Sequence, residues 1–311
     1  MPAPRTLRNK TVVITGASRG IGLAMALRFA QDGANVAILA KTAEPHPKLP
    51  GTIYTAAKDI EAAGGKALPL LCDVRNEEQV KQCIDKVVAT FGGIDILVNN
   101  ASAISLTTSQ STTMKSYDLM NQINARGTFM CSKYCIPHLR KSSNPHILAI
   151  SPPLRMKPEY FGAHTAYTIS KFGMSLVMLG LSHELKDEYI AVNALWPRTP
   201  VATAALMVIT GFQDFENIKQ ARNDKIMSDA AYEIVTSDST MCTGNFFIDE
   251  DLIRDKTVGF EQYAICPGEK LGDDFFVEDC DENVNKKIIQ EKYERDLPIE
   301  EEKTRRLLSK L

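Results

Sequence analysis

The chain has 311 residues, of which 44% are hydrophobic and 24% charged, and its formal net charge is -2 at pH 7. This balance is that of an ordinary globular protein, so the composition favours neither nucleic acid nor an anionic membrane as a partner. The first ten residues lack an apolar core and no long uninterrupted apolar stretch follows, so we expect neither a secretory signal nor a membrane span.

Seven short runs rich in β-branched and other apolar residues predict the strands of one buried sheet. They span residues 11–15, 35–40, 66–72, 94–99, 146–151, 190–195 and 245–249. Segments of helical length separate most of them, for example residues 20–31, 77–91, 114–139 and 163–186. This alternation predicts an α/β fold with a doubly wound, mainly parallel, seven-stranded sheet.

The composition changes after Gly272. The following residues carry many charges of both signs and few apolar anchors, which is typical of a tail rather than of a packed domain. We therefore expect a single domain over residues 1–272 and a charged C-terminal tail over residues 273–311.

The cysteines show no spacing typical of a metal site. They are Cys72, Cys83, Cys131, Cys135, Cys242, Cys266 and Cys280. No two of them form a C-x-x-C pair, and no histidine completes a zinc site. Cys131 and Cys135 could meet on one helix as a metal or redox pair, but buried apolar thiols are the favoured interpretation. We predict no metal.

A glycine-rich segment directly follows the first predicted strand and opens a helix. It reads Gly16-Ala17-Ser18-Arg19-Gly20-Ile21-Gly22. Glycine permits a tight turn and the close approach of a pyrophosphate to the helix N-terminus, where free N–H groups and the helix dipole favour negative charge. A tight turn without a ligand is the alternative, but the position in the first strand–helix unit predicts a Rossmann-type dinucleotide site.

Two cations predict which dinucleotide binds. Enzymes that use NAD usually have an acidic residue at the end of the second strand, where it binds the ribose hydroxyls. Here that position holds Lys41, and Arg19 lies inside the glycine-rich segment. Both could pair with a 2'-phosphate, so NADP(H) is favoured over NAD(H). The alternative for each is a solvated surface cation.

Tyr167 and Lys171 are four residues apart in the predicted helix over residues 163–186, so their side chains share one face. A tyrosine that acts as an acid or base near neutrality needs its pKa lowered from about 10, and a neighbouring ammonium has the right sign of charge. Ser151 ends the fifth strand, where its hydroxyl could hold a substrate oxygen beside the tyrosine. An exposed i,i+4 pair without chemistry is the alternative for Tyr167 and Lys171.

Taken in order, four motifs resemble those of the short-chain dehydrogenase/reductase family over residues 10–249. They are TGASRGIG at 15–22, CDV at 72–74, NNAS at 99–102 and YTISK at 167–171. The resemblance implies a Rossmann-type enzyme, with Tyr167, Lys171 and Ser151 as catalytic residues. It also places the Lys171 ammonium on the nicotinamide ribose. It further implies a homodimer or homotetramer, which forms through the helices that begin near residues 114 and 163.

The same resemblance assigns three further residues. Asp73 would hydrogen-bond the adenine amino group, Asn99 would help hold the central sheet and the cofactor, and Asn124 would hold a water that links Lys171 to solvent. Each has a structural alternative: Asp73 could cap the helix that begins near Asn76, Asn99 could close a turn, and Asn124 could bend its helix.

The sequence departs from the family pattern at three places. Ser102 replaces a glycine, Ser151 precedes Tyr167 by 16 positions and is followed by two prolines, and Arg198 replaces a glycine after Pro197. Longer stretches, such as residues 40–57, 92–106 and 243–250, resemble one subgroup of the family that shares these departures. Ser151 is therefore the catalytic assignment that transfers least directly.

These residues predict hydride transfer between a nicotinamide ring and a carbonyl or alcohol. The mainly apolar segment over residues 199–215 suggests an apolar substrate, such as a lipid-like or fatty-acyl compound, although core residues have the same composition. Two alternatives remain open: a cofactor-binding sensor or scaffold without turnover, and an epimerisation or dehydration on the same fold.

The last three residues, Ser309, Lys310 and Leu311, form the tripeptide that peroxisomal import receptors bind at a free C-terminus. The charged residues before it favour an accessible tail. We therefore expect a peroxisomal protein that binds an import receptor, with the mitochondrion and the cytosol as alternatives.

Overall fold

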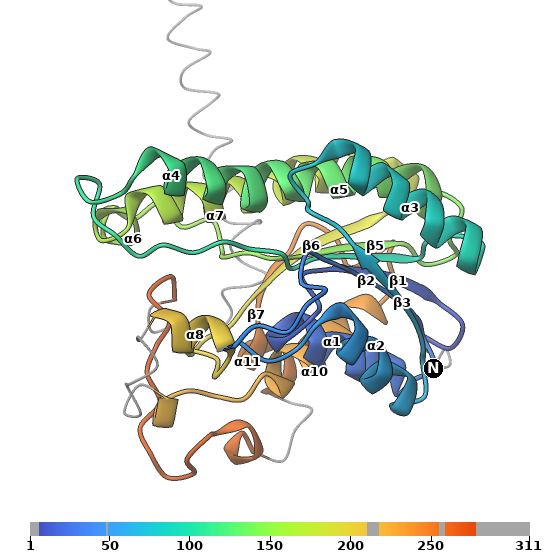
Figure 1. Cartoon of the computed structure of the whole chain (residues 1–311). Coiled ribbons are helices and arrows are strands. Elements are labelled where there is room, and N and C mark those ends of the chain that lie inside the picture. The colour runs from blue at the N-terminus through green and yellow to red at the C-terminus, as the bar shows by residue number, and fades with distance from the viewer. Residues whose placement is uncertain (1–5, 48, 210–217, 255–258, 278–311) are drawn as a thin grey trace, which may run out of the picture.

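The computed structural model describes residues 6–47, 49–209, 218–254 and 259–277. A seven-stranded sheet lies between two layers of helices (Figure 1). Its strands are β1 (Thr11–Thr15), β2 (Asn35–Ala40), β3 (Lys66–Leu71), β4 (Ile96–Asn99), β5 (His146–Ile150), β6 (Ala191–Trp196) and β7 (Phe246–Ile248). Their order is β3-β2-β1-β4-β5-β6-β7, and each neighbouring pair is parallel. The predicted doubly wound fold is therefore confirmed.

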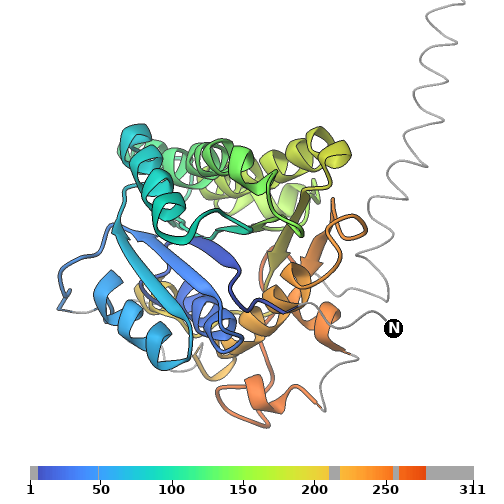
Figure 2. The same cartoon turned by 90° about the vertical axis from the view of Figure 1, so that its right-hand side faces the viewer.

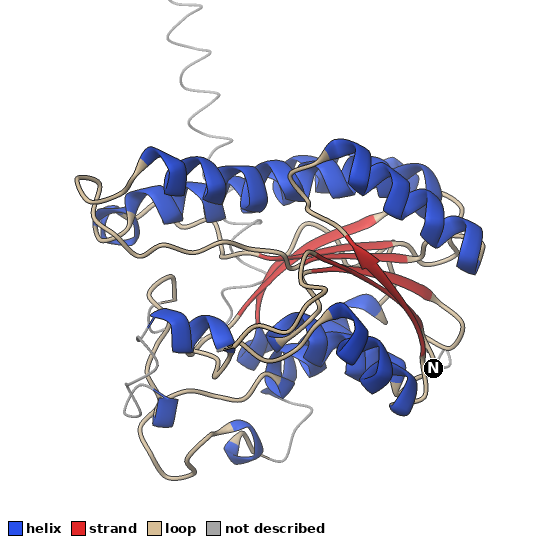
Figure 3. Cartoon of the chain, in the orientation of Figure 1, coloured by secondary structure: helices blue, strands red, loops and turns tan. Residues whose placement is uncertain are grey.

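The helices cover both faces of this sheet (Figure 2). One layer contains α1 (Gly20–Ala30), α2 (Ile53–Ala62), α10 (Lys225–Val235) and α11 (Asp249–Ile253). The other contains α3 (Glu77–Phe91), α4 (Met114–Asn121), α5 (Gly127–Leu139) and α7 (Thr165–Glu184). The short helices α6 (Pro158–Gly162) and α8 (Ala204–Ile209) follow β5 and β6 in the chain (Figure 3). Both faces of the sheet are thus removed from water, which explains why its strands are continuous apolar runs.

Local capping fixes where α3 begins and ends. The side chain of Asn76 accepts a hydrogen bond from the backbone N–H of Gln79, and two glutamates in the first turn complement the helix dipole. Gly92 ends the helix in the left-handed conformation, with φ at 88°. The cap is therefore Asn76, so the alternative interpretation of Asp73 as the capping residue is wrong.

The long helix predicted over residues 114–139 is interrupted. A π-helical turn, η1 (Gln122–Arg126), separates α4 from α5. Such turns insert one extra residue into the helical hydrogen-bond pattern and are frequent at functional sites. Asn124 lies in this turn, so the bend considered for this asparagine corresponds to a π-helical turn in the structure.

The folded domain extends beyond the predicted boundary at residue 272. Phe276 is 1% exposed and Val277 is also buried, and both pack in the same apolar core as α1 and α10. A few apolar side chains can anchor a segment whose other residues are mostly charged. The average composition after Gly272 therefore did not indicate this packing. The remainder of the predicted tail, residues 278–311 with the Ser309-Lys310-Leu311 ending, lies outside the described residues.

Candidate active site

A cavity of about 370 Å³ lies at the carboxyl ends of the central strands. All residues of the predicted glycine-rich segment except Ala17 line it. Lys41 and Asp73 lie at one end of the lining, and Tyr167 and Lys171 at the other. The structure thus brings together the two predicted halves of the site, which are more than 90 residues apart in the sequence.

The glycine-rich segment is held by the end of β4. Gly16 adopts a φ of 70°, and a Cβ on it would lie 2.9 Å from the Cα of Ala101, so only glycine fits this turn. The hydroxyl of Thr15 accepts hydrogen bonds from the backbone N–H groups of Asn100 and Ala101, both at 3.0 Å. The Asn100 amide in turn donates to the carbonyl oxygens of Thr15 at 2.9 Å and Gly16 at 3.2 Å. Ala17 is fully buried beneath the segment.

Asn100, rather than Asn99, lines the cavity. The Asn99 amide donates to the Ser132 hydroxyl at 3.1 Å, so its side chain is directed toward α5. A direct cofactor contact of Asn99 is therefore not supported, although its expected role in holding the sheet fits this contact. Alternation along β4 is the signal that could have distinguished the two, because Asn99 shares a face with Leu97 and Asn100 lies on the opposite face.

Arg19 is directed toward the loop that follows β2. Its Nη2 donates to the carbonyl oxygen of Gly51 at 2.7 Å, while its buried Nε has no hydrogen-bond partner among the described residues. Gly51 has a φ of 92°, and a Cβ there would lie 2.5 Å from the Ser18 carbonyl oxygen. The two loops are therefore in close contact, with Lys41 exposed at the base of the second loop. Sequence analysis missed Gly51, because its partner is distant in the chain.

Asp73 lies at the end of β3 with its carboxylate paired to Arg75. The Arg75 hydrogen bonds, and the positive charges of Arg75 and Lys41, hold the pKa of this carboxyl below its usual range. The group is therefore an ionised acceptor at the cavity wall. Its contact with an adenine amino group stays a prediction.

Tyr167 and Lys171 both lie on α7, as predicted, and both are buried. The Lys171 Nζ donates to the carbonyl oxygen of Ile150 at 2.6 Å and lies 4.9 Å from the ring centroid of Trp196. Burial lowers the pKa of Lys171 to about 7. Burial and the carboxylate of Asp274 raise the pKa of Tyr167. The sequence predicted a lowered tyrosine pKa, and the direction is opposite because desolvation by burial and the negative charge of Asp274 both disfavour the phenolate.

Ser151 directly follows β5 and is 1% exposed. Its backbone N–H donates to the Leu195 carbonyl oxygen at 3.2 Å, and its hydroxyl has no hydrogen-bond partner within the described ranges. A buried hydroxyl without a partner is costly unless a ligand satisfies it. Ser151 is not part of the cavity lining, and its catalytic role stays a prediction.

Asn124 positions the loop after β4 against α7. Its carbonyl oxygen accepts from the N–H of Ala103 at 2.7 Å, and its amide donates to the Ala103 carbonyl oxygen and to the Ser170 hydroxyl, both at 2.9 Å. Ser170 is the neighbour of Lys171 in the chain. These three hydrogen bonds use both polar atoms of the Asn124 side chain for support, and the expected link through water stays a prediction.

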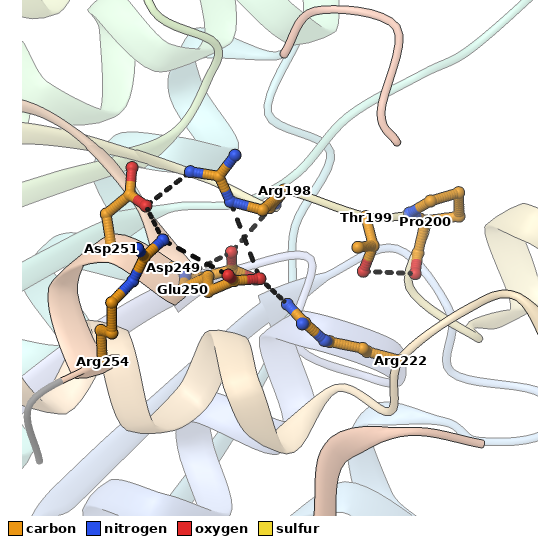
Figure 4. Close-up of polar contacts among 8 residues, drawn as sticks. All are labelled: Arg198, Thr199, Pro200, Arg222, Asp249, Glu250, Asp251 and Arg254. Carbon is orange, nitrogen blue, oxygen red and sulfur yellow. Dashed lines mark hydrogen bonds and ion pairs between the residues drawn. The ribbon is translucent and has the colours of Figure 1, made fainter. Parts of the chain in front are cut away.

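Arg198, which replaces the expected glycine, is directed into a cluster of ionic side chains (Figure 4). Its guanidinium pairs with Asp251 and Glu250, and Glu250 also binds Arg222 at 2.6 Å. The backbone N–H of Arg198 donates to the buried carboxyl of Asp249 at 2.9 Å. The side chain is therefore engaged at the β6–β7 edge and leaves the cavity free.

The comparisons with known proteins agree with this geometry. Residues 10–212 match the short chain dehydrogenase family, and a short chain dehydrogenase of Mycobacterium thermoresistibile has the same fold, with a TM-score of 0.83. That pair is 49% identical and covers 88% of this chain and 96% of the other. The chain belongs to the short-chain dehydrogenase/reductase family and is an NAD(P)-dependent oxidoreductase.

Within that family the chain is similar to hydroxysteroid dehydrogenase-like protein 2. It is 57% identical to the Danio rerio protein over 277 residues, which cover 89% of this chain and 66% of that protein. It is 53% identical to the Homo sapiens protein over 289 residues, which cover 93% of this chain and 68% of that protein. The chain thus spans about two thirds of the length of these relatives. The resemblance of its longer stretches to one subgroup is confirmed.

Two features of the described residues bear on partners. None of their helices combines the length and the apolar character that a bilayer crossing requires. In the same residues, no three His, Cys, Asp or Glu side chains gather as they would around a metal ion. Cys131 and Cys135 are fully buried in the core, and burial raises the pKa of both thiols, which makes them unreactive.

Proposed function

We propose that the chain is an NADP(H)-dependent oxidoreductase that moves a hydride between nicotinamide and a carbonyl or alcohol of an apolar, lipid-like or fatty-acyl compound. One observation carries this proposal. A single cavity has the cations Arg19 and Lys41 at one end and the pair Tyr167 and Lys171 at the other.

The cationic end supports the preference for NADP(H). The lining at the end of β2 contains Ala40, Lys41 and Thr42, with no carboxylate where an NAD enzyme usually has one. Asp73, the acidic residue in the lining, is paired with Arg75. A 2'-phosphate at this end would therefore meet two cations and little repulsion.

The chain's own residues supply proton transfer and orientation. When bound, the reduced cofactor provides the hydride for the carbonyl carbon. The Tyr167 hydroxyl then donates its proton to the carbonyl oxygen, so that C=O becomes CH–OH. The Ser151 hydroxyl, which needs a partner, would hold that oxygen. Lys171 would orient the nicotinamide ribose.

The test is NADPH consumption with a panel of aldehydes, ketones and acyl derivatives. We expect turnover with apolar members and its loss in Tyr167→Phe. Tyr189→Phe, which changes an exposed tyrosine, is the matched control. Tight NADPH binding without any turnover would instead indicate a sensor or scaffold. Conversion of a substrate without net NADPH consumption would indicate epimerisation or dehydration.

We also propose a homodimer or homotetramer. Apolar side chains are exposed on the outer helix layer, including Phe129 on α5 and Ile169, Leu176 and Leu179 on α7. Exposed apolar residues that gather on adjacent helices are typical of an interface. The predicted interface helices thus carry suitable side chains, and sedimentation at micromolar concentration tests the assembly.

Our proposal for location is the peroxisome, for a chain in which Ser309-Lys310-Leu311 is the free C-terminus. The test compares a fluorescent protein fused to the N-terminus of the chain with the same fusion lacking the last three residues. Import that depends on these residues supports the proposal. The same diffuse signal from both fusions would contradict it and leave the enzymatic proposal untouched.

A further inference from the structure

The segment over residues 274–277 packs directly on the catalytic tyrosine. The ring of Phe276 stacks on that of Tyr167, with centroids 6.2 Å apart and an interplanar angle of 26°. Phe275 lies 4.4 Å from Phe276 and 6.2 Å from Tyr167, again between ring centroids. Phe276 also contacts Trp196 edge to face at 5.6 Å. Aromatic side chains thus pack on the Tyr167 ring.

Asp274 anchors this segment. Its carboxylate accepts hydrogen bonds from the Trp196 indole N–H at 2.8 Å and from the backbone N–H of Phe276 at 2.9 Å. Its own N–H donates to the Arg198 carbonyl oxygen at 2.8 Å. Arg198 is in turn held by the ionic cluster of Figure 4. The anchor is therefore built on residues that are themselves fixed.

The site is closed beside Ser151, where a substrate oxygen would lie. The Ser151 hydroxyl is buried and finds no hydrogen-bond partner in the described part of the chain, and the cavity reaches Tyr167 without reaching Ser151. Phe275, in contrast, is 42% exposed. The hydrogen bonds of the segment involve Asp274, Phe276 and Val277, so the Phe275 ring can move while these bonds are kept.

We propose that Asp274, Phe275 and Phe276 form the substrate side of the active site, where the two phenyl rings contact the apolar part of the substrate and limit its size. Phe275, the exposed ring, yields to a long substrate, while Asp274 keeps Phe276 against Tyr167. This inference rests on the proposed reduction of an apolar carbonyl compound. It adds specificity residues that lie outside every motif of the sequence.

Trp196 provides a direct readout, because it is the only tryptophan in the chain and it contacts both Asp274 and Phe276. The full chain is saturated with NADP+, and its tryptophan emission and acrylamide quenching are followed during titration with decanamide or butanamide. We expect the ten-carbon amide to change both signals and the four-carbon amide to change neither. In Phe275→Ala the apparent Kd for decanamide should fall severalfold.

The activity readout is the ratio of kcat/KM for decanal to that for butanal, with NADPH. Phe275→Ala should raise this ratio about fivefold or more, because removal of the ring that limits substrate size leaves space for the longer chain. Phe29→Leu, which alters a fully buried phenylalanine of α1, serves as the control for a general loss of stability and should leave the ratio unchanged.

Two results would overturn the inference: decanamide without effect on Trp196, or an unchanged chain-length ratio in Phe275→Ala. Failure of the proposed function looks different. In that case decanamide still perturbs Trp196 in a manner that depends on Phe275, but no carbonyl compound of the panel consumes NADPH. The specificity role of the segment would then stand without the proposed reaction.

Discussion

The preference for NADPH over NADH should depend more on Arg19 than on Lys41. The Arg19 guanidinium is partly buried and is fixed by its hydrogen bond to the Gly51 carbonyl oxygen, and its Nε has no hydrogen-bond partner among the described residues. Lys41 is exposed, so water screens its charge and its flexible side chain must be ordered on binding. An oriented guanidinium and a solvated ammonium therefore make unequal contributions to the same anion.

The magnitudes follow from these environments. A charge-assisted hydrogen bond from an oriented, partly buried donor contributes about 1.5–3 kcal/mol, whereas an exposed ion pair contributes about 0.2–1 kcal/mol. Arg19→Ala should therefore lower the ratio of the NADH Kd to the NADPH Kd roughly 10- to 100-fold. Lys41→Ala should lower it only about 1.5- to 5-fold.

Isothermal titration with both cofactors measures this ratio, which cancels any damage that affects both cofactors equally. Lys81→Ala removes an exposed lysine of α3 and should leave the ratio unchanged. Raising the salt concentration about tenfold should diminish the Lys41 effect more than the Arg19 effect. An unchanged ratio in Arg19→Ala, or a larger effect of Lys41→Ala, would refute the assignment of the phosphate to these side chains.

Three further predictions concern catalysis, stability and assembly. Tyr167→Phe should lower turnover roughly 100-fold or more while NADPH affinity is retained, since only the transferable proton is lost; stopped-assay kinetics and titration check both parts. Burial raises the pKa of Asp249 from 3.8 to about 7, so its contribution to stability is present below pH 4 and is lost as the pH rises through 7. The free energy of unfolding of Asp249→Asn, measured in urea, should therefore rise by about 2–3 kcal/mol relative to that of the unmodified chain between pH 5 and pH 8. A difference between the two chains that does not change with pH would contradict this. Leu176→Glu, on an α7 side chain that is 58% exposed, should dissociate the oligomer in sedimentation without unfolding it, whereas Met241→Glu should not.

Much of this site could be predicted because its signals are local. The glycine-rich segment follows a strand within a few residues, and Tyr167 and Lys171 are separated by one helical turn, so spacing alone places their side chains. The burial pattern of each strand likewise reports its place in the sheet. Asn99 and Asn100 are adjacent in the sequence. The motif indicated Asn99 as the residue near the cofactor, whereas the alternation of side chains along β4 places Asn100 at the cavity.

The remainder depends on contacts between distant parts of the chain. Gly51 must be a glycine because its loop, which begins more than 20 residues after Ser18, packs against the Ser18 carbonyl oxygen. No local sequence pattern indicates such a contact. Phe276 lies more than 100 residues from Tyr167, inside a stretch whose average composition indicates a tail. The pKa of Tyr167 also escaped prediction, because its direction is set by burial that only tertiary structure reveals.

The departure from the family pattern at Arg198 is linked to the aromatic segment that packs on Tyr167. A glycine after Pro197 would leave that position without a side chain, whereas Arg198 pairs with Asp251 and Glu250 and so holds the strand end in place. The carbonyl oxygen of the same residue accepts the hydrogen bond from Asp274, which starts the segment that packs on Tyr167. Arg198 therefore connects the ionic cluster, through its side chain, with the aromatic segment over residues 274–277, through its carbonyl oxygen. Because the Arg198 side chain is directed away from the cavity, this arrangement adds a wall to the substrate side without obstructing the cofactor side.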